Sequence, residues 1–382
     1  MSRKLVLLTA AALILIGVQA AHAQLKVGIT VCASGPAAVL GLPEMKAVAT
    51  LPKEIAGQSV TYVALDDQSD PTKGAQNARK LVTEDKVDVL MGSSLTSVSL
   101  SLIDIAAESK TPLMAMGASV ALVVPLDEKK RWVYKVVPND SVMAKAILNY
   151  IAKTGAKTLG FLGVSDAYGE GYYKELIELA PSRGITLTTH EVYARGDDSV
   201  TGQVLKILAT KPDAVFIASS GSPAVLPQKA LRERGYSGPI YQTHGIASDD
   251  FIRLGGKAVE GAIFAGEAFT IATDLPAESP FRQPTTDFVQ KYREANGQSP
   301  PIFGAHPYDS MALIARAMPA ALKIAKPGTP EFRAALREEL EKGKDVYLNN
   351  GLSNITPADH SGYDERSAFI IKIEGGAFRL AK

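Results

Sequence analysis

The stretch KVDVLMGSSLTSVSLSLIDIAAES (residues 86–109) places a short apolar run before a loop of small hydroxyl side chains and then a helical pattern. Six of the eleven residues from Met91 to Ser101 carry a hydroxyl group. A strand that leads through a polar loop into a helix is the repeating unit of α/β proteins. The hydroxyl groups suit three kinds of site: a nucleophilic serine, a phosphate-binding loop, or an uncharged binding loop for another anion.

The alternation of strand and helix patterns continues through the chain after Gln24. Helical patterns occupy residues 72–85, 141–155, 201–211 and 222–235. Continuously apolar strands between helices predict parallel sheets covered on both faces, and therefore an α/β fold class. The strands form two groups joined by an extended link, KVVPNDS (135–141). The predicted strands are KVGITV (26–31), VTYVAL (60–65), VDVLM (87–91), PLMAM (112–116), KTLGFLG (157–163), DAVFIAS (213–219) and AFIIKI (368–373).

The first 23 residues have the pattern of a secretory signal peptide. Arg3 and Lys4 precede an apolar run, Leu5 to Val18, and Ala21-His22-Ala23 fits a small-x-small cleavage site. The apolar run is shorter than the roughly 20 residues that span a bilayer. We predict cleavage after residue 23 and an exported mature chain.

The composition excludes two classes of protein. Cys32 is the single cysteine, so the exported chain is not a small scaffold held by disulfides. Removing residues 1–23 takes away two positive charges and no acid, which changes the formal net charge from +1 to −1. A nearly neutral chain without basic clusters argues against nucleic acid as a partner.

Five predicted strand ends indicate where a ligand binds, because ligands of parallel sheets lie beyond the carboxyl ends of the strands. Glycine lets the backbone approach a ligand closely, and amides and hydroxyl groups at helix starts can donate to an anion. Ser and Thr are also ordinary helix N-caps, so a single loop does not define a site. Several such loops together favour a shared site. The loops are CASGPA (32–37), GSSLTS (92–97), GAS (117–119), SDAYGEG (165–171) and SSGSP (219–223).

The sequence lacks the common catalytic motifs. It contains no GxSxG, His-Glu-x-x-His, GxxxxGK[ST] or GxGxxG pattern. Asp66-Asp67 precedes a turn and a helix start, which favours a capping role. We expect no enzyme activity, no metal and no cofactor, because the histidines are scattered without metal-ligand spacing at His190, His244, His306 and His360.

Six segments carry a resemblance to a known family: KVGITVCASGPAAVLG (26–41), LDDQSDPTKGAQNARKLV (65–82), GSSLTS (92–97), PLMAMGAS (112–119), SDAYGEGYYKEL (165–176) and PDAVFIASSGSPAVLPQKALRERGY (212–236). In this order they resemble the periplasmic substrate-binding proteins of ABC importers, and most closely the leucine/isoleucine/valine-binding type. The resemblance implies two Rossmann-like lobes with parallel central sheets, joined by three hinge crossovers, as in the type I fold. The first lobe is expected to span 24–137 plus 266–350 and the second 138–265 plus 351–382. The crossovers should lie near Val137-Pro138, Phe264–Gly266 and Asn350–Ser353.

The resemblance also assigns a carboxylate-binding end to the site. In this family the loops that correspond to GSSLTS and GAS hold the ligand's carboxylate through hydroxyl groups and backbone amides. Thr96 and Ser119 match the two hydroxyl positions, with Ser97, Gly117 and Ala118 beside them. Neutral donors stabilise an anion and still let it leave.

Two aromatic residues match the family's walls on either side of the ligand. Tyr168 in DAYGEG corresponds to a wall from the second lobe, and Phe303 in PIFGAHPYD to a wall from the first lobe. Leu40 and Gly221 (or its neighbour Ser220) stand where amino-acid binders often place aromatic side chains. These two departures imply a cavity of different shape.

A further departure concerns the ligand's amino group. In IYQTHG (240–245), His244 falls at or near the position of an acid that pairs with the α-ammonium of amino-acid ligands. The next acid along the chain is Asp249, and Glu267 beyond the second crossover could turn inward. A buried ammonium without a counter-charge is costly, so the ligand is expected to lack an amino group. The segments YQTHG and SPAVLPQKALRERGY also resemble a branch linked to aromatic carboxylates such as benzoates and phenylpropenoids.

We therefore expect a monomeric, periplasmic solute-binding protein that delivers a small carboxylate to an ABC permease in the inner membrane. Three alternatives remain open at this point. The ligand can be a branched-chain or other amino acid, the partner can be a sensor in place of a permease, or the same cleft can belong to a hydrolase.

Overall fold

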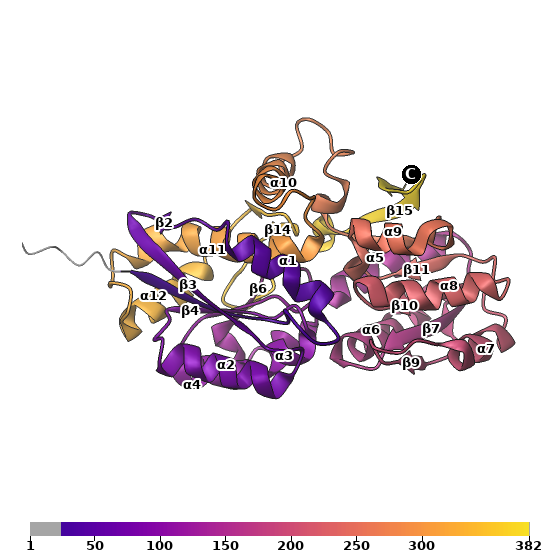
Figure 1. Cartoon of the computed structure of the whole chain (residues 1–382), viewed down its shortest axis with the longest axis horizontal. Coiled ribbons are helices and arrows are strands. Elements are labelled where there is room, and N and C mark those ends of the chain that lie inside the picture. Colours follow the sequence, from indigo (N-terminus) through magenta and orange to yellow (C-terminus); the bar gives the residue numbers. More distant parts are fainter. Residues whose placement is uncertain (1–23, 382) are drawn as a thin grey trace, which may run out of the picture.

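The computed structural model describes residues 24–381 and shows two α/β lobes side by side (Figure 1). The predicted signal peptide, residues 1–23, lies outside the described residues. In Figure 1 one lobe combines the indigo and purple N-terminal elements with the orange helices α11 and α12. The other lobe contains the middle of the chain and the yellow strand β15. Each lobe is therefore built from segments far apart in the sequence.

The first lobe has a six-stranded sheet in the order β2-β3-β1-β4-β5-β6. Its strands are β1 (Leu25–Val31), β2 (Glu54–Ile55), β3 (Gln58–Asp66), β4 (Val89–Gly92), β5 (Leu113–Ala115) and β6 (Val133–Lys135). Its helices are α1 (Ala38–Val48), α2 (Pro71–Thr83), α3 (Thr96–Ser101), α4 (Ile103–Ser109), α11 (Ala305–Ala321) and α12 (Pro330–Leu340). The short pair β13 (Val346–Tyr347) and β14 (Leu352–Ser353) follows α12, and α10 (Arg282–Asn296) precedes α11.

The second lobe has a sheet in the order β16-β15-β12-β11-β10-β7-β8, and β9 also pairs with β7. Its strands are β7 (Thr158–Val164), β8 (Thr186–Leu187), β9 (Glu191–Tyr193), β10 (Ala214–Ala218), β11 (Ile240–Gln242), β12 (Ile263–Gly266), β15 (Phe369–Glu374) and β16 (Ala377–Leu380). Its helices are α5 (Asp140–Lys153), α6 (Ala167–Leu179), α7 (Thr201–Ala209), α8 (Val225–Glu233) and α9 (Asp249–Gly255).

The register of the strands confirms the predicted α/β class. All seven predicted strands form, and β1 pairs in parallel with β3 on one side and β4 on the other. In the second lobe, β7 pairs in parallel with β10 on one side and with β8 and β9 on the other. Strand order thus reverses at β1 and at β7, and such switch points open a crevice at the carboxyl ends of the strands. β15 pairs antiparallel with β12, and the C-terminal strand β16 pairs antiparallel with β15 at the edge of the sheet.

Local sequence explains why helices start directly beyond the strands. Asp166 accepts hydrogen bonds from the N–H groups of Tyr168 and Gly169 and so caps α6. At Gly169 a Cβ atom would lie 2.0 Å from the carbonyl oxygen of Val164, so only glycine lets α6 pack this closely on the end of β7. Tyr168, one residue earlier, is thereby fixed at the crevice.

The chain passes between the lobes three times. It leaves the first lobe after Lys135, returns after Gly266, and enters the second sheet for the last time at Phe369. The third crossover lies later than predicted, because residues 354–363 still pack against the first lobe. Lys135 N–H donates to the carbonyl of His360, and the Tyr363 hydroxyl donates to the carbonyl of Val136. The predicted end of the first lobe at residue 350 is therefore too early.

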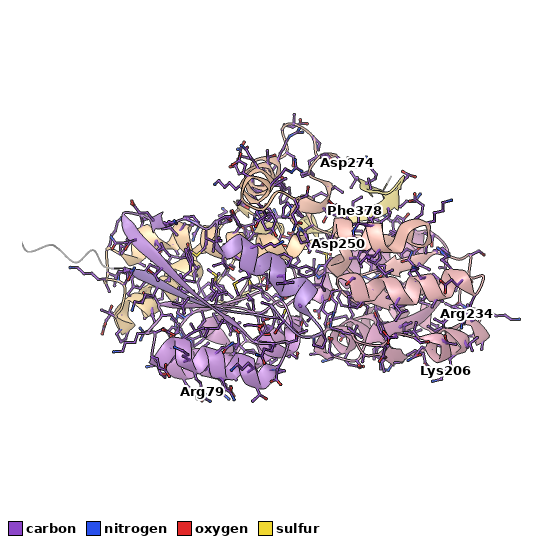
Figure 2. The ribbon with its side chains drawn as sticks, in the orientation of Figure 1. Arg79, Lys206, Arg234, Asp250, Asp274 and Phe378 are labelled. Atoms are coloured by element: carbon purple, nitrogen blue, oxygen red, sulfur yellow. The ribbon has the colours of Figure 1, made fainter. Side chains whose placement is uncertain are left out.

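Charged side chains project from the outer surfaces of both lobes. Arg79 on α2 and Lys206 on α7 project from the outer faces of the two lobes, away from where the lobes meet (Figure 2). Among residues 24–381, no helix has the length and apolar character needed to cross a membrane.

Asp309 on α11 ties down the segment that leads into the third crossover. Its carboxylate is buried and accepts four hydrogen bonds, from the backbone and side-chain N–H groups of Asn349 and Asn350. Four donors on two oxygens suit an ionised carboxylate, although burial raises the pKa of Asp309 to about 6. The clamp fixes Asn349 and Asn350, which precede the third crossover, on the first lobe.

We predict that Asp309→Ala lowers the free energy of unfolding by about 2–4 kcal/mol, because it leaves buried donors unpaired. Urea denaturation at pH 7.5 measures the change. The exposed Asp104→Asn substitution is the control and should change the free energy by less than about 0.5 kcal/mol. Equal effects of the two substitutions would contradict the clamp.

Candidate ligand-binding site

A cavity lies between the lobes, at the carboxyl ends of both sheets. Its walls come from the segments that follow β4, β5, β6 and β7, from those that follow β9, β10, β11 and β12, and from the start of α11 with the turn before it. One wall is apolar and includes Met116, Val137 and Ile302. The cavity is lined by Ser94, Thr96, Met116, Ala118, Val137, Tyr168, Arg195, Ser220, His244, Gly245, Glu267, Ile302, Phe303 and His306.

Five residues that the sequence singled out line this cavity: Thr96, Ala118, Tyr168, His244 and Phe303. The hydroxyl groups of Thr96 and Tyr168 are buried and have no hydrogen-bond partner among residues 24–381. The Tyr168 and His244 rings are nearly parallel, with centroids 6.4 Å apart. Buried polar atoms normally have partners, so these two hydroxyl groups are available to a ligand.

Three other predicted residues lie around the first-lobe loops but do not line the cavity. Ser97 faces a separate groove that Ser69 and Asp166 also line. The Ser119 hydroxyl accepts the N–H of Ala121 and caps a short helical turn. The side chain of Ser119 is thus engaged in its own loop.

Gly117 belongs to the support behind the cavity. Its carbonyl and that of Ser119 both accept hydrogen bonds from the ammonium group of Lys135, which is completely buried. In a trans peptide the N–H points opposite to the carbonyl, so the N–H of Ala118 points away from Lys135. The contact between Lys135 and the Gly117 carbonyl thus orients this peptide group. The N–H of Ala118, a residue that lines the cavity, points away from Lys135 and has no acceptor among the described residues.

Leu40 and Gly221 lie outside the cavity, where the two lobes contact each other. Gly221 has φ +65°, and a Cβ atom at this position would lie 2.7 Å from Val39 and 3.4 Å from Leu40. The absence of a side chain at Gly221 lets α1 of the first lobe approach the loop after β10. These two departures from the family's pattern thus shape the contact between the lobes.

Glu267 corrects the expectation that the site lacks an acid near His244. Its side chain is only 2% exposed, and Oε1 lies 2.7 Å from His244 Nδ1. Oε2 is buried without a hydrogen-bond partner among residues 24–381. Glu267 directly follows β12, and His244 lies shortly after β11. Because these two strands are adjacent and parallel, their carboxyl ends lie at the same edge of the sheet and bring the two side chains together.

Arg195 was not anticipated from the sequence. It follows β9 and lines the cavity, with Nε donating to Asp166 Oδ2 at 2.7 Å and Nη1 donating to Ser220 Oγ at 2.9 Å. The acid that caps α6 thus also neutralises this guanidinium. The pairing of β9 with β7 is the feature that brings Arg195 to the cavity, and β9 is only three residues long, which leaves little signal in the sequence.

Ser94 and His306 complete the first-lobe end of the cavity. Ser94 Oγ lies 2.7 Å from His306 Nδ1 and also contacts the carboxyl group of Glu44, which α1 holds completely buried. The sequence analysis treated His306 as one of several scattered histidines. Its position three residues after Phe303, at the start of α11, is the signal that could have identified it.

Two lobes that enclose a cavity with unpartnered donors define the class of solute-binding proteins. Residues 24–377 match the family model of periplasmic binding proteins, and the chain belongs to this family. It is of the Leu/Ile/Val-binding type and has the type I fold. The relatives in this family are substrate-binding proteins and not enzymes.

Three relatives illustrate the similarity. An extracellular ligand-binding receptor from Rhodopseudomonas palustris HaA2 is 69% identical, with a TM-score of 0.92 over 94% of this chain and 100% of the other. Leu/Ile/Val-binding protein homolog 3 of Brucella melitensis is 21% identical over 94% of this chain and 93% of its own. A solute-binding protein of an ABC transporter from R. palustris, solved with benzoate, shares the fold at 20% identity, with a TM-score of 0.80 over 94% and 95% of the two chains.

Lys135 gives the site a measurable pH signature, because burial lowers its pKa from 10.5 to about 7. Between these values the unfolded chain holds a proton that the folded protein has lost, so this residue makes stability rise with pH. We predict that the difference in unfolding free energy between wild type and Lys135→Met grows by about 1.4 kcal/mol per unit from pH 7.5 to 9. Urea denaturation at several pH values checks this. A difference that does not change with pH would contradict the lowered pKa of the buried Lys135.

Proposed function

We propose that the protein is the periplasmic solute-binding component of an ABC importer and that it binds a small aromatic carboxylate reversibly between its lobes. The observation that carries the proposal is a cavity with unpartnered donors at its first-lobe end and aromatic side chains from both lobes. Ligand binding stabilises the closed arrangement of the lobes, and the closed form is then recognised by the permease. The protein acts as a monomer and performs no chemistry.

The first-lobe end is proposed to hold the carboxylate. The buried Thr96 hydroxyl and the free N–H of Ala118 are donors without acceptors among residues 24–381. A carboxylate has several acceptor positions and matches these donors. The buried ammonium of Lys135 behind the loop adds positive potential without touching the ligand.

The middle of the cavity is proposed to hold an apolar ring. Tyr168 comes from the second lobe and Phe303 from the first, and Met116, Val137 and Ile302 complete the apolar surface. Burial of an aromatic ring against such walls gives the main apolar contribution to affinity. A ring that contacts both lobes also couples binding to closure.

The second-lobe end is proposed to bind a ring hydroxyl. His244 and Glu267 face each other across 2.7 Å, and Oε2 of Glu267 has no partner among the described residues. A phenol can donate to the carboxylate and accept from the imidazole. Hydroxybenzoates and hydroxycinnamates have this arrangement of a carboxylate, a ring and a hydroxyl.

Glu267 also supports a second candidate, an amino-acid ligand. Its buried carboxylate can neutralise an α-ammonium, which removes the reason for excluding amino acids that the sequence suggested. The two candidates differ in what Glu267 meets, a neutral hydroxyl group or a positive charge. This difference gives the experiment that separates them.

We predict that the refolded, ligand-free protein binds 4-hydroxybenzoate or 4-hydroxycinnamate and does not bind leucine, isoleucine or valine. Isothermal titration calorimetry measures both ligand classes after unfolding and refolding have removed any carried-over ligand. Glu267→Gln should weaken binding of the hydroxylated acids and leave unsubstituted benzoate unchanged. Micromolar or tighter leucine binding, lost in Glu267→Gln and without binding of any aromatic acid, would establish the amino-acid candidate instead.

We predict that Thr96→Val weakens binding of the carboxylate by about 1–3 kcal/mol, because the ligand's buried acceptor loses its donor. Ser97→Ala is the matched control: the residue is adjacent, carries the same functional group, and faces a different groove. Calorimetry should find its affinity unchanged. If both variants bind as the wild type does, the carboxylate does not lie at the first-lobe end.

A further inference from the structure

Glu44, Ser94 and His306 form a chain of hydrogen-bonding groups that ends at the cavity. The Glu44 carboxyl group is fully buried, and its Oε1 contacts Ser94 Oγ. Ser94 Oγ lies 2.7 Å from His306 Nδ1. His306 lines the cavity, and no described residue forms a hydrogen bond with its other ring nitrogen, Nε2. The chain therefore connects a buried acid to one ring nitrogen and leaves the other nitrogen for a ligand.

The burial of this chain determines its charge. Oε2 of Glu44 has no partner among residues 24–381, and no Lys or Arg side chain there lies within ion-pair distance of the carboxyl group. Burial raises the pKa of Glu44 to about 8 and lowers the pKa of His306 to about 3. At pH 7 the acid thus holds its proton and the imidazole is neutral.

With these protonation states the hydrogen bonds run in one direction. With the acid protonated, Oε1 of Glu44 takes the donor role towards Ser94 Oγ, whereas an ionised Glu44 accepts this bond from Ser94, and the Ser94 hydroxyl then donates its own proton to His306 Nδ1. Nδ1 is then the acceptor of the neutral ring, so the ring's proton must be on Nε2. The partner of one ring nitrogen fixes the tautomer of the other.

We infer that Glu44 is a positioning residue that acts through Ser94 to hold His306 as the Nε2–H tautomer, so that His306 donates to the ligand's carboxylate. This inference rests on the proposed function, because it assigns the carboxylate to the first-lobe end of the cavity. It adds a specificity-determining residue, His306, to the hydroxyl and amide donors of the two loops. A ligand that presents a hydrogen-bond donor at this end is rejected by the same N–H.

Loss of the Glu44 proton reverses the direction of both hydrogen bonds between Glu44, Ser94 and His306. The Ser94 hydroxyl then donates to the Glu44 carboxylate, Nδ1–H donates to Ser94 Oγ, and Nε2 keeps a lone pair towards the ligand; the lost proton goes to solvent. Affinity for an anion should therefore fall as the pH rises through about 8. Other titratable groups also face this chain: Cys32 and Asp67 towards Glu44, and Glu267, His244 and Lys135 towards His306.

The tautomer can be measured without any ligand. Nitrogen-15 NMR of the histidine rings separates protonated from unprotonated ring nitrogens, and His306→Gln assigns the signal among His190, His244, His306 and His360. We expect Nε2–H at pH 7 and Nδ1–H above about pH 8 in the wild type, and Nε2–H at every pH in Glu44→Gln. An Nδ1–H ring at pH 7, or a wild-type tautomer that does not change up to pH 9.5, overturns the inference. The wild-type titration decides even if Glu44→Gln does not fold.

The effect on binding is measured with benzoate, which has no group that titrates between pH 6.5 and 9. We expect wild-type affinity to fall about tenfold from pH 7 to pH 9, because one unit above the pKa leaves roughly a tenth of Glu44 protonated. Glu44→Gln should lose most of this fall and keep only the smaller decrease that comes from the loss of the Lys135 proton. Asp67→Asn, a nearby acid outside the chain, is the matched control and should keep the wild-type profile.

Failure of the proposed function and failure of this inference give different results. If benzoate does not bind, leucine below pH 9 serves as the carboxylate, and the aromatic proposal alone is wrong. If benzoate binds with the same affinity at pH 7 and pH 9, if leucine binds with the same affinity throughout its range below pH 9, or if Glu44→Gln keeps the full pH dependence, the inference is wrong.

Discussion

The carboxyl ends of the parallel strands in one lobe face those in the other lobe, and the position of every site residue depends on this arrangement. Each sheet reverses strand order at one strand, β1 or β7, and opens a crevice there. Because the crevices oppose each other, residues from eight strand ends meet in one cavity. Elements far apart in sequence thereby share a site.

The charged side chains of the site are buried, and each contacts another group of the protein. The Arg195 guanidinium is paired with Asp166, the Lys135 ammonium is held by two backbone carbonyls, and Glu267 faces His244. Under the proposed function, the ligand meets hydroxyl and N–H donors at the first-lobe end, and the cations lie behind these donors or are already paired. Such donors bind an anion without the desolvation cost of a bare ion pair, which suits a protein that must release its ligand.

The fold could be predicted from the sequence because the patterns that indicate it depend on residues close together along the chain. Strand and helix patterns, the Asp166 cap and the small residues after strands depend on neighbours along the chain, and all seven predicted strands form. The candidate site was predicted in part. Thr96, Ala118, Tyr168, His244 and Phe303 line the cavity, since each follows a strand or precedes a helix in a recognisable motif. Arg195 and His306 were missed, and Glu267 was noted only as an acid that could turn inward, because only the pairing of strands and the return of α11 bring these residues to the cavity. Ser119 shows the converse case, in which a hydroxyl group at the expected place is used by its own loop.

The central claim is that a carboxylate binds at the first-lobe end of the cavity, with the ring between Tyr168 and Phe303. A crystal structure of the mature protein with 4-hydroxybenzoate tests this claim most directly. The account predicts the carboxylate within hydrogen-bond distance of Thr96 Oγ1, the N–H of Ala118 and His306 Nε2, and the ring hydroxyl at His244 and Glu267. A carboxylate bound to Arg195 and Ser220 at the second-lobe end, with the ring reversed, would contradict it.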